Sequence, residues 1–308
     1  MPSFATEVKN ELARDIVRAK CCQNAELAAL LRMGASVTIG ANMSLGLNFI
    51  TENAAVARKT LQLLKATGQV QPEVTVSRDK RLKKKNSYFL RVAPSSKVRE
   101  MMEALGILGD EAEVGKNKRL LRKRCCRIAY LRGAFLGGGT VNKPEAACHL
   151  ELTTDNYGFA DALVHIMRNM ELPAGITDRR NVYQIYMKDG EAIMDFLDML
   201  GAHKAVQEME VARNVKEVRS QVNRLVNCET ANLQKTVEAS LAQVNSIKVL
   251  QEKQGLDSLK PALKAAAEAR LAHPEASLAD LAEMLDVSRS CVSHRLRKLQ
   301  ELSKGILK

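Results

Sequence analysis

The feature that most constrains the fold is an internal repeat with a period of 104 residues, measured from Cys21 to Cys125. In each copy a double cysteine precedes an apolar segment that begins with Leu and carries small residues, 27–35 in the first copy and 131–139 in the second. A β-prone run follows each segment. A repeat this long indicates a duplicated half-domain rather than a solenoid unit. We therefore expect two halves related by a pseudo-twofold axis, with the small-residue helices at their seam.

The spacing of apolar residues predicts the same order of elements in both halves, after an amphipathic first helix over 4–19. In the first half the expected elements are helix 24–34, a β-hairpin over 35–51, helix 53–67, strands 73–77 and 87–92, and helix 96–105. In the second half they are helix 125–136, strands 140–141 and 148–153, helix 156–170, strands 175–179 and 182–187, and helix 190–200. Each half follows the order αββαββα, which predicts an α+β fold.

From about residue 205 the pattern becomes purely helical, and His273-Pro274 marks a further boundary because proline cannot continue a helix. We expect an N-terminal helix over 1–20, the duplicated domain over 21–204 with halves of about 21–110 and 120–204, a helical linker over 205–235, and an all-α C-terminal domain over 236–308. The polar segment Asn223–Lys235 is interpreted as a polar helix face or an inter-domain hinge, and its role is left open.

The net charge of the 308-residue chain is +12, which favours a polyanionic partner such as nucleic acid. Aromatic residues make up 4% of the chain and Trp is absent, which disfavours a single-strand binder that stacks bases. The N-terminus does not resemble a signal peptide, and no apolar run of about 18 residues predicts a membrane span. The seven cysteines are typical of a reducing compartment, so we expect a cytoplasmic protein that does not bind a membrane.

The segment 277–303 has the pattern of a helix-turn-helix. Leu281 and the small Ala282 form the inner face of its first helix, residues 286–288 form the turn, and Ser288 caps the second helix. The second helix has a buried stripe of Val292, Leu296 and Leu299. The residues expected to bind DNA are Ser288, Arg289, Ser290, Cys291, Ser293, His294, Arg295, Arg297 and Lys298.

The alternative for this segment is an ordinary helical hairpin with a solvated basic face. The unit resembles the recognition fold of region four of bacterial sigma factors. Asp286 stands where many such motifs have Gly, so the sequence departs from the common pattern at the turn.

The two repeated helices resemble the paired helices of the LAGLIDADG homing endonucleases. That resemblance implies acidic metal-binding residues near the helix ends, and these positions fall on Gly34 and Gly138. Asp and Glu are absent from 27–51 and from 131–144, so the oxygen ligands that hard cations need are missing. We expect no cleavage activity. The domain can still cradle duplex DNA or serve as a protein-binding scaffold.

Two further features are interpreted conservatively. Adjacent cysteines do not have the spacing of a tetrahedral zinc site, so both pairs are interpreted as small buried hydrophobes, and we expect neither a metal nor a cofactor. A basic run in a predicted hairpin loop is either a solvated loop or a set of secondary phosphate contacts. Its cations are Lys80, Arg81, Lys83, Lys84 and Lys85.

The degenerate LAGLIDADG-like domain, the Asn223–Lys235 segment and the C-terminal helix-turn-helix, in this order, resemble the WhiA family over essentially the whole chain. The resemblance implies a bacterial DNA-binding protein tied to cell division and chromosome segregation, and to sporulation in some lineages, and associated with the nucleoid. We expect a non-enzymatic protein that binds specific double-stranded DNA sequences. The alternatives are a nucleoid-associated or transcription-machinery-binding scaffold, with RNA polymerase as a partner, and an active endonuclease. The oligomeric state is left open.

Overall fold

The computed structural model describes residues 2–15, 17–68, 70–78, 86–109, 119–180 and 182–306. The chain forms two compact units, residues 1–216 and 217–308, which are divided within the long helix α8 (His203–Gln254). In the described parts of the chain, no helix combines the length and apolar character that a membrane crossing requires.

The first unit contains the predicted duplication. After α1 (Phe4–Arg14), its first half comprises α2 (Lys20–Gly34), β1 (Ala35–Ile39), β2 (Leu45–Thr51), α3 (Ala54–Gly68), β3 (Glu73–Arg78), β4 (Asn86–Ser95) and α4 (Ser96–Ala104). Its second half comprises α5 (Arg124–Gly138), β5 (Gly139–Val141), β6 (Leu150–Thr154), α6 (Tyr157–Arg168), β7 (Gly175–Arg179), β8 (Val182–Met187) and α7 (Gly190–Leu200). The predicted order αββαββα is therefore confirmed in both halves.

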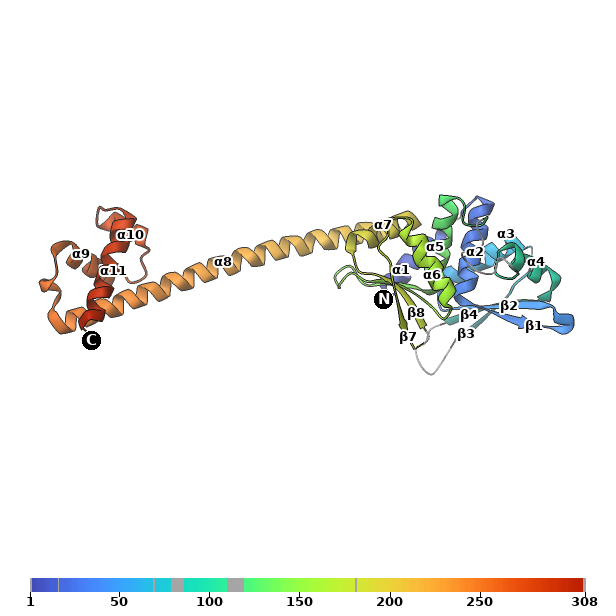
Figure 1. The fold of residues 1–308 in the computed structure, drawn as a ribbon, viewed down its shortest axis with the longest axis horizontal. Helices are drawn as coiled ribbons and strands as arrows, with labels where there is room; N and C mark the ends of the chain where they lie inside the picture. The colour runs from blue at the N-terminus through green and yellow to red at the C-terminus, as the bar shows by residue number, and fades with distance from the viewer. Residues whose placement is uncertain are drawn as a thin grey trace. The chain divides into compact units, whose positions relative to one another are not determined.

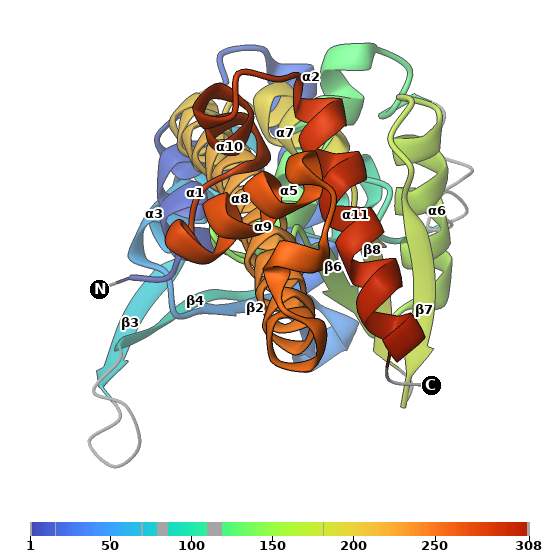
Figure 2. The ribbon, with the colours of Figure 1, turned by 90° about the vertical axis from the view of Figure 1, so that its left-hand side faces the viewer.

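Each half carries one antiparallel four-stranded sheet, and the two sheets share the same topology. The strand order is β1-β2-β4-β3 in the first and β5-β6-β8-β7 in the second. Residues along β6 alternate between buried and half-buried, as in a sheet that is covered by helices on one face only. In Figure 1 the helices of this unit lie above the strands, and Figure 2 shows the same unit turned by 90°.

Helices α2 and α5 pack side by side along the seam between the halves (Figure 1). Small residues allow this close approach: a side chain at Gly133 would meet the backbone oxygen of Glu26 and the Cβ of Ala29, at 3.1 Å from the latter. A side chain at Gly137 would meet Met33. The prediction of small-residue helices at the seam is confirmed.

Two element ends differ from the prediction. The first helix ends at Arg14 instead of continuing to 19, and Asp15 has an extended backbone. The helix ends here because Lys59 Nζ donates hydrogen bonds to the backbone oxygens of Leu12 and Asp15. Helix α5 continues through Gly137 and Gly138 instead of ending before them. Helical glycines cost stability, but here they let α5 approach α2 closely.

The second unit is all helical. The end of α8, α9 (Pro261–Ala272), α10 (Leu278–Met284) and α11 (Arg289–Ile306) enclose a small core. Its fully buried members include Ile247 and Leu250 of α8, which pack with the stripe predicted on α11. The predicted linker and the beginning of the predicted C-terminal domain lie on the single helix α8, where every residue of Asn223–Lys235 is exposed.

Candidate nucleic-acid interface

The helix-turn-helix begins with a side-chain cap. Ser277 Oγ accepts hydrogen bonds from the backbone N–H groups of Ala279 and Asp280, both at 3.2 Å. Asp280 returns the contact, since its carboxylate accepts from the N–H of Ser277 at 2.9 Å. This reciprocal arrangement is a capping box, and it fixes where α10 starts. Leu281 and Ala282 are buried, as the pattern predicts.

The turn between α10 and α11 adopts the geometry for which glycine is usually selected. Asp286 has a φ of 50°, in the left-handed region that L-residues other than Asn and Asp seldom adopt. The N–H of Val287 then bonds back to the oxygen of Ala282 at 3.0 Å, and Ser288 Oγ accepts from the N–H of Cys291 at 3.3 Å. The predicted cap at Ser288 is present, and the aspartate fits the turn.

The exposed side of α11 carries most of the predicted DNA-binding residues. The side chains of Val292, Leu296 and Leu299 are buried, which turns the rest of the helix outward. Positions 290, 293 and 297 share one face because they are three to four residues apart. Seven of the predicted residues are exposed and two are half-buried. The exposed ones are Ser288, Arg289, Ser290, Ser293, His294, Arg297 and Lys298, and the half-buried ones are Cys291 and Arg295.

A polar pocket of about 370 Å³ lies beside the start of α11 within the second unit. Arg289 lines it together with Lys235 of α8 and Arg270 of α9. Arg270 is 2% exposed, and its guanidinium holds the loop before α10 by donating to the backbone oxygen of Ala276 at 2.6 Å. Burial lowers the pKa of Arg270. These cations bring positive charge close to the predicted DNA-binding face.

Lys235 and Arg270 were not among the residues predicted to form the site. The sequence does not indicate that α8, which carries Lys235, passes beside the start of α11. Arg270 lies in an alanine-rich helix that resembles any surface helix. The only feature of the sequence that could have indicated a role for Arg270 at this site is its position just before the His273-Pro274 boundary.

The exposed faces of the two sheets form a second candidate surface. In the first sheet Ile50 pairs with Phe89 and Asn48 with Arg91 on this face. In the second sheet Glu151 pairs with Tyr186 and Thr153 with Gln184. A hollow of about 240 Å³ on the second face is lined mainly by polar side chains. They are His149, Glu151, Thr177, Arg179, Gln184, Tyr186 and Lys188.

The basic run expected to make secondary phosphate contacts lies outside the described residues. This applies to Lys80, Arg81, Lys83, Lys84 and Lys85.

The two positions assigned to former metal ligands lie at the ends of α2 and α5, where an added side chain would be crowded by its neighbours. A Cβ at Gly138 would lie 2.5 Å from Met33 Cε and 2.7 Å from the oxygen of Thr153. A Cβ at Gly34 would lie 3.0 Å from the ring of Phe49. An acidic side chain at either place would require its neighbours to shift.

The acidic residue on α2 serves the packing of the seam. Glu26 is fully buried and forms a salt bridge with Lys59 at 3.0 Å. Arg132 Nη1 lies 3.9 Å from the same carboxylate and 2.9 Å from Asp15. Burial raises the pKa of Glu26, while Lys59 and Arg132 oppose the shift.

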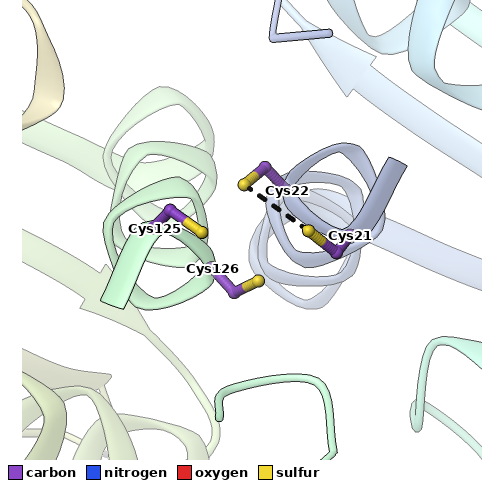
Figure 3. Close-up of side chains that lie close together, drawn as sticks. All are labelled: Cys21, Cys22, Cys125 and Cys126. Carbon is purple, nitrogen blue, oxygen red and sulfur yellow. Dashed lines mark hydrogen bonds between the residues drawn. The ribbon is translucent and has the colours of Figure 1, made fainter. Parts of the chain in front are cut away.

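The double cysteines differ from their interpretation as small buried hydrophobes. Cys22 and Cys126 are buried, but Cys21 and Cys125 lie at the surface. The four sulfur atoms lie within 4.8 Å of one another, between the first turns of α2 and α5 (Figure 3). Spacing within one pair does not reveal this group, because each helix supplies two thiols and the seam brings them together.

Three family models match consecutive parts of the chain. They are the WhiA N-terminal LAGLIDADG-like domain at residues 20–108, the WhiA LAGLIDADG-like domain at 127–219, and the WhiA C-terminal HTH domain at 222–303. The "Probable cell division protein WhiA" of Desulforamulus reducens is 47% identical over 99% of this chain and 96% of its own. The protein with the same name in Heliobacterium modesticaldum is 44% identical over 98% and 96%.

Solved structures show the same fold. The full-length DUF199/WhiA from Thermatoga maritima aligns over 98% of both chains with a TM-score of 0.62 and 22% identity. The N-terminal LAGLIDADG domain of DUF199/WhiA aligns over 65% of this chain and 91% of its own, with a TM-score of 0.52 and 20% identity.

Proposed function

Since the chain belongs to the WhiA family, we propose that it binds specific sequences of double-stranded DNA without enzymatic activity, in the service of cell division and chromosome segregation. The observation that carries the proposal is the exposed face of α11, where basic and hydroxyl side chains follow a side-chain-capped turn. The names of the relatives support the role in cell division. Regulation of transcription, and of sporulation in some lineages, belongs to the same proposal, as does a place at the nucleoid in the cytoplasm.

In the proposed complex α11 enters the major groove from its N-terminal end. Arg289, Ser290 and Ser293 approach base edges, where a guanidinium can bind guanine and hydroxyls can donate or accept. Arg295, Arg297 and Lys298 mainly neutralise phosphates. Lys298 contributes least, because its ammonium already lies 3.2 Å from the carboxylate of Glu301.

The ends of α2 and α5 support the proposed lack of enzymatic activity. A LAGLIDADG-type nuclease needs carboxylates there to hold the metal ions that activate water. The chain has glycine at both positions, and the packing around Gly138 leaves no space for a replacement. Glu26 is buried with Lys59 about two turns away from the end of α2, so it does not supply the missing ligand.

The DNA-binding proposal is tested with the double variant Arg289→Ala/Arg297→Ala. Its matched control is Arg58→Ala/Lys65→Ala, which removes the same charge from exposed positions on α3. Genomic fragments retained by the full chain are identified first, and affinities for one such site and for a scrambled duplex are then measured over a range of salt. We expect the first variant to lose at least tenfold in affinity for the site and to show a shallower salt dependence. The control keeps its preference for the site.

The proposal fails if the double variant folds normally and retains site preference. The nuclease alternative is tested separately by incubating the full chain with the retained duplex and Mg²⁺ or Mn²⁺. Nicked or cut duplex would contradict the non-enzymatic assignment without affecting the assignment of α11.

A protein-binding scaffold is the second candidate function, and one observation favours it. Val218, Val222 and Leu225 recur every three to four residues on α8 and are exposed. Such a stripe is typical of a helix that packs against another protein. In this alternative, with RNA polymerase as one partner, Val218→Ser/Val222→Ser abolishes cellular function while Arg289→Ala/Arg297→Ala leaves it intact.

A further inference from the structure

Four cysteine side chains meet at the seam between the two halves of the first unit. Cys21 and Cys22 are the second and third residues of α2, and Cys125 and Cys126 hold the same places on α5. Figure 3 shows all four sulfur atoms pointing into the space between the two helices. Among the residues that the structure describes, this is the group of His, Cys, Asp and Glu side chains that lie closely enough together to hold a metal ion.

We propose that these four cysteines bind one zinc ion as thiolates. A tetrahedral site with Zn–S distances of about 2.3 Å places its sulfur atoms about 3.8 Å apart. The sulfur atoms here lie within 4.8 Å of one another, so changes of about 1 Å in side-chain position complete the tetrahedron. Four sulfur ligands in this geometry select soft, tetrahedral metals, and zinc satisfies the site without redox chemistry.

The two helix starts suit a cluster of negative charge. In the described starts of the two helices, neither N-cap residue, Ala19 or Lys123, forms a side-chain cap. Neither first turn contains an acidic residue. The cysteines lie in the first turns, so the positive ends of both helix dipoles are close to the sulfur atoms. Lys20, Lys123 and Arg124 add positive charge nearby, which offsets the charge that four thiolates carry around one Zn²⁺.

Zinc binds cysteine as thiolate, so binding displaces protons from the thiols and the affinity for zinc should rise with pH.

The position of the group gives the metal a structural role. Each half contributes two ligands, and the ion joins the first turns of the two helices that form the seam. This also accounts for the presence of a double cysteine in each copy of the repeat, because neither pair completes a tetrahedral site alone.

The test measures metal content in the full chain, purified without a polyhistidine tag or chelator and kept reduced with a phosphine. Metals are quantified by mass spectrometry after dialysis against equimolar zinc. The test variant is Cys21→Ser/Cys125→Ser, which changes the two surface positions and spares the buried pair. The matched control is Cys148→Ser/Cys228→Ser, which also removes two exposed cysteines. We expect about one zinc per chain in the parent and the control, and at least a tenfold loss in the test variant.

Substitution with Co²⁺ supplies a readout that does not depend on stability. The parent and control should show thiolate-to-cobalt charge-transfer bands and the intense visible bands of a tetrahedral centre, and the test variant should lack them. The proposal would be overturned if the parent protein is metal-free, or if a folded test variant retains zinc. It would also be overturned if the site holds iron in place of zinc, or if the mass of the protein shows a disulfide between these cysteines under reducing purification. Circular dichroism confirms that each variant is folded.

Discussion

Gly133 of α5 faces the backbone carbonyl of Glu26 of α2, at a place where any side chain would collide with that oxygen. Backbone cannot move aside as a flexible side chain can, so the approach of the two helices depends on this glycine. Gly137, one turn further along α5, faces the side chain of Met33, where a Cβ would collide with Met33 Cβ. The contact between the two halves is thus set by residues that have no side chain.

We predict that Gly133→Ala lowers the free energy of unfolding by about 3 kcal/mol, because overpacking against fixed backbone is at the upper end of such costs. Urea denaturation followed by circular dichroism measures the change. The control is Gly158→Ala on α6, where a Cβ would meet only Asn156 Oδ1, at 3.6 Å. That variant should be as stable as the parent or slightly more stable. Equal stability of the two variants would contradict the close approach.

A second prediction concerns Glu11 of α1, which caps the start of α8. Its carboxylate accepts hydrogen bonds from the backbone N–H groups of Lys204, at 2.8 Å, and Ala205, at 3.3 Å. Glu11→Ala should cost about 1 kcal/mol, and Glu11→Gln should cost less because the amide oxygen still accepts. Thermal unfolding of the parent and the two variants measures the order of their stabilities. An alanine variant as stable as the parent would show that the cap contributes nothing.

A third prediction is a pH dependence that arises from Lys9. Burial lowers the pKa of Lys9 to about 8, whereas an unfolded lysine has a pKa of about 10.4. Below pH 8 the folded protein therefore holds this charge at a cost, and the cost disappears as the pH rises from about 8 to about 10.4.

Lys9→Met should accordingly raise the free energy of unfolding at pH 7, by about 1 kcal/mol, since the side chain is half-buried rather than fully buried. The gain should shrink at pH 10. Urea denaturation at both pH values, with the exposed Lys65→Met as control, provides the measurement. A gain that is equal at the two pH values would assign it to packing instead of to charge.

A fourth prediction concerns the turn of the helix-turn-helix. Asp286 has a φ of 50°, which costs an L-residue roughly 1 kcal/mol relative to glycine. Asp286→Gly should leave the stability of the second unit unchanged or raise it by up to about 1 kcal/mol, since the flexibility of glycine offsets part of the gain. Asp286→Val should destabilise this unit, because β-branched residues are strained there. A valine variant as stable as the glycine variant would contradict the left-handed turn.

Much of the fold could be predicted because it depends on local patterns and on the repeat. The observed helices α2 and α5 are separated by the same 104 residues at both ends, from Lys20 to Arg124 and from Gly34 to Gly138. The stripe of Val292, Leu296 and Leu299 likewise predicts which face of α11 is buried. Patterns of this kind lie within a single element, so no tertiary information is needed to recognise them.

The features that could not be predicted depend on contacts between distant elements. The four cysteines meet only because α2 and α5 pack side by side and bring their first turns together, and ligand spacing within either pair argues against a metal. The stop after Arg14 depends on Lys59, a residue of α3 whose ammonium reaches back to α1. A buried lysine cannot be distinguished from a solvated one by its neighbours in the sequence.

The two halves share one topology, yet the exposed faces of their sheets differ. Ile50 and Phe89 pair on one, whereas Thr153 and Gln184 pair on the other. A symmetric dimer of single halves would present identical faces, so a rod-like partner could lie across it in either direction. Because both copies are encoded in one chain, each half can carry different residues on its exposed face. A partner can therefore distinguish one end of the domain from the other. The duplication therefore gives this domain a polarity that its symmetric architecture would otherwise lack.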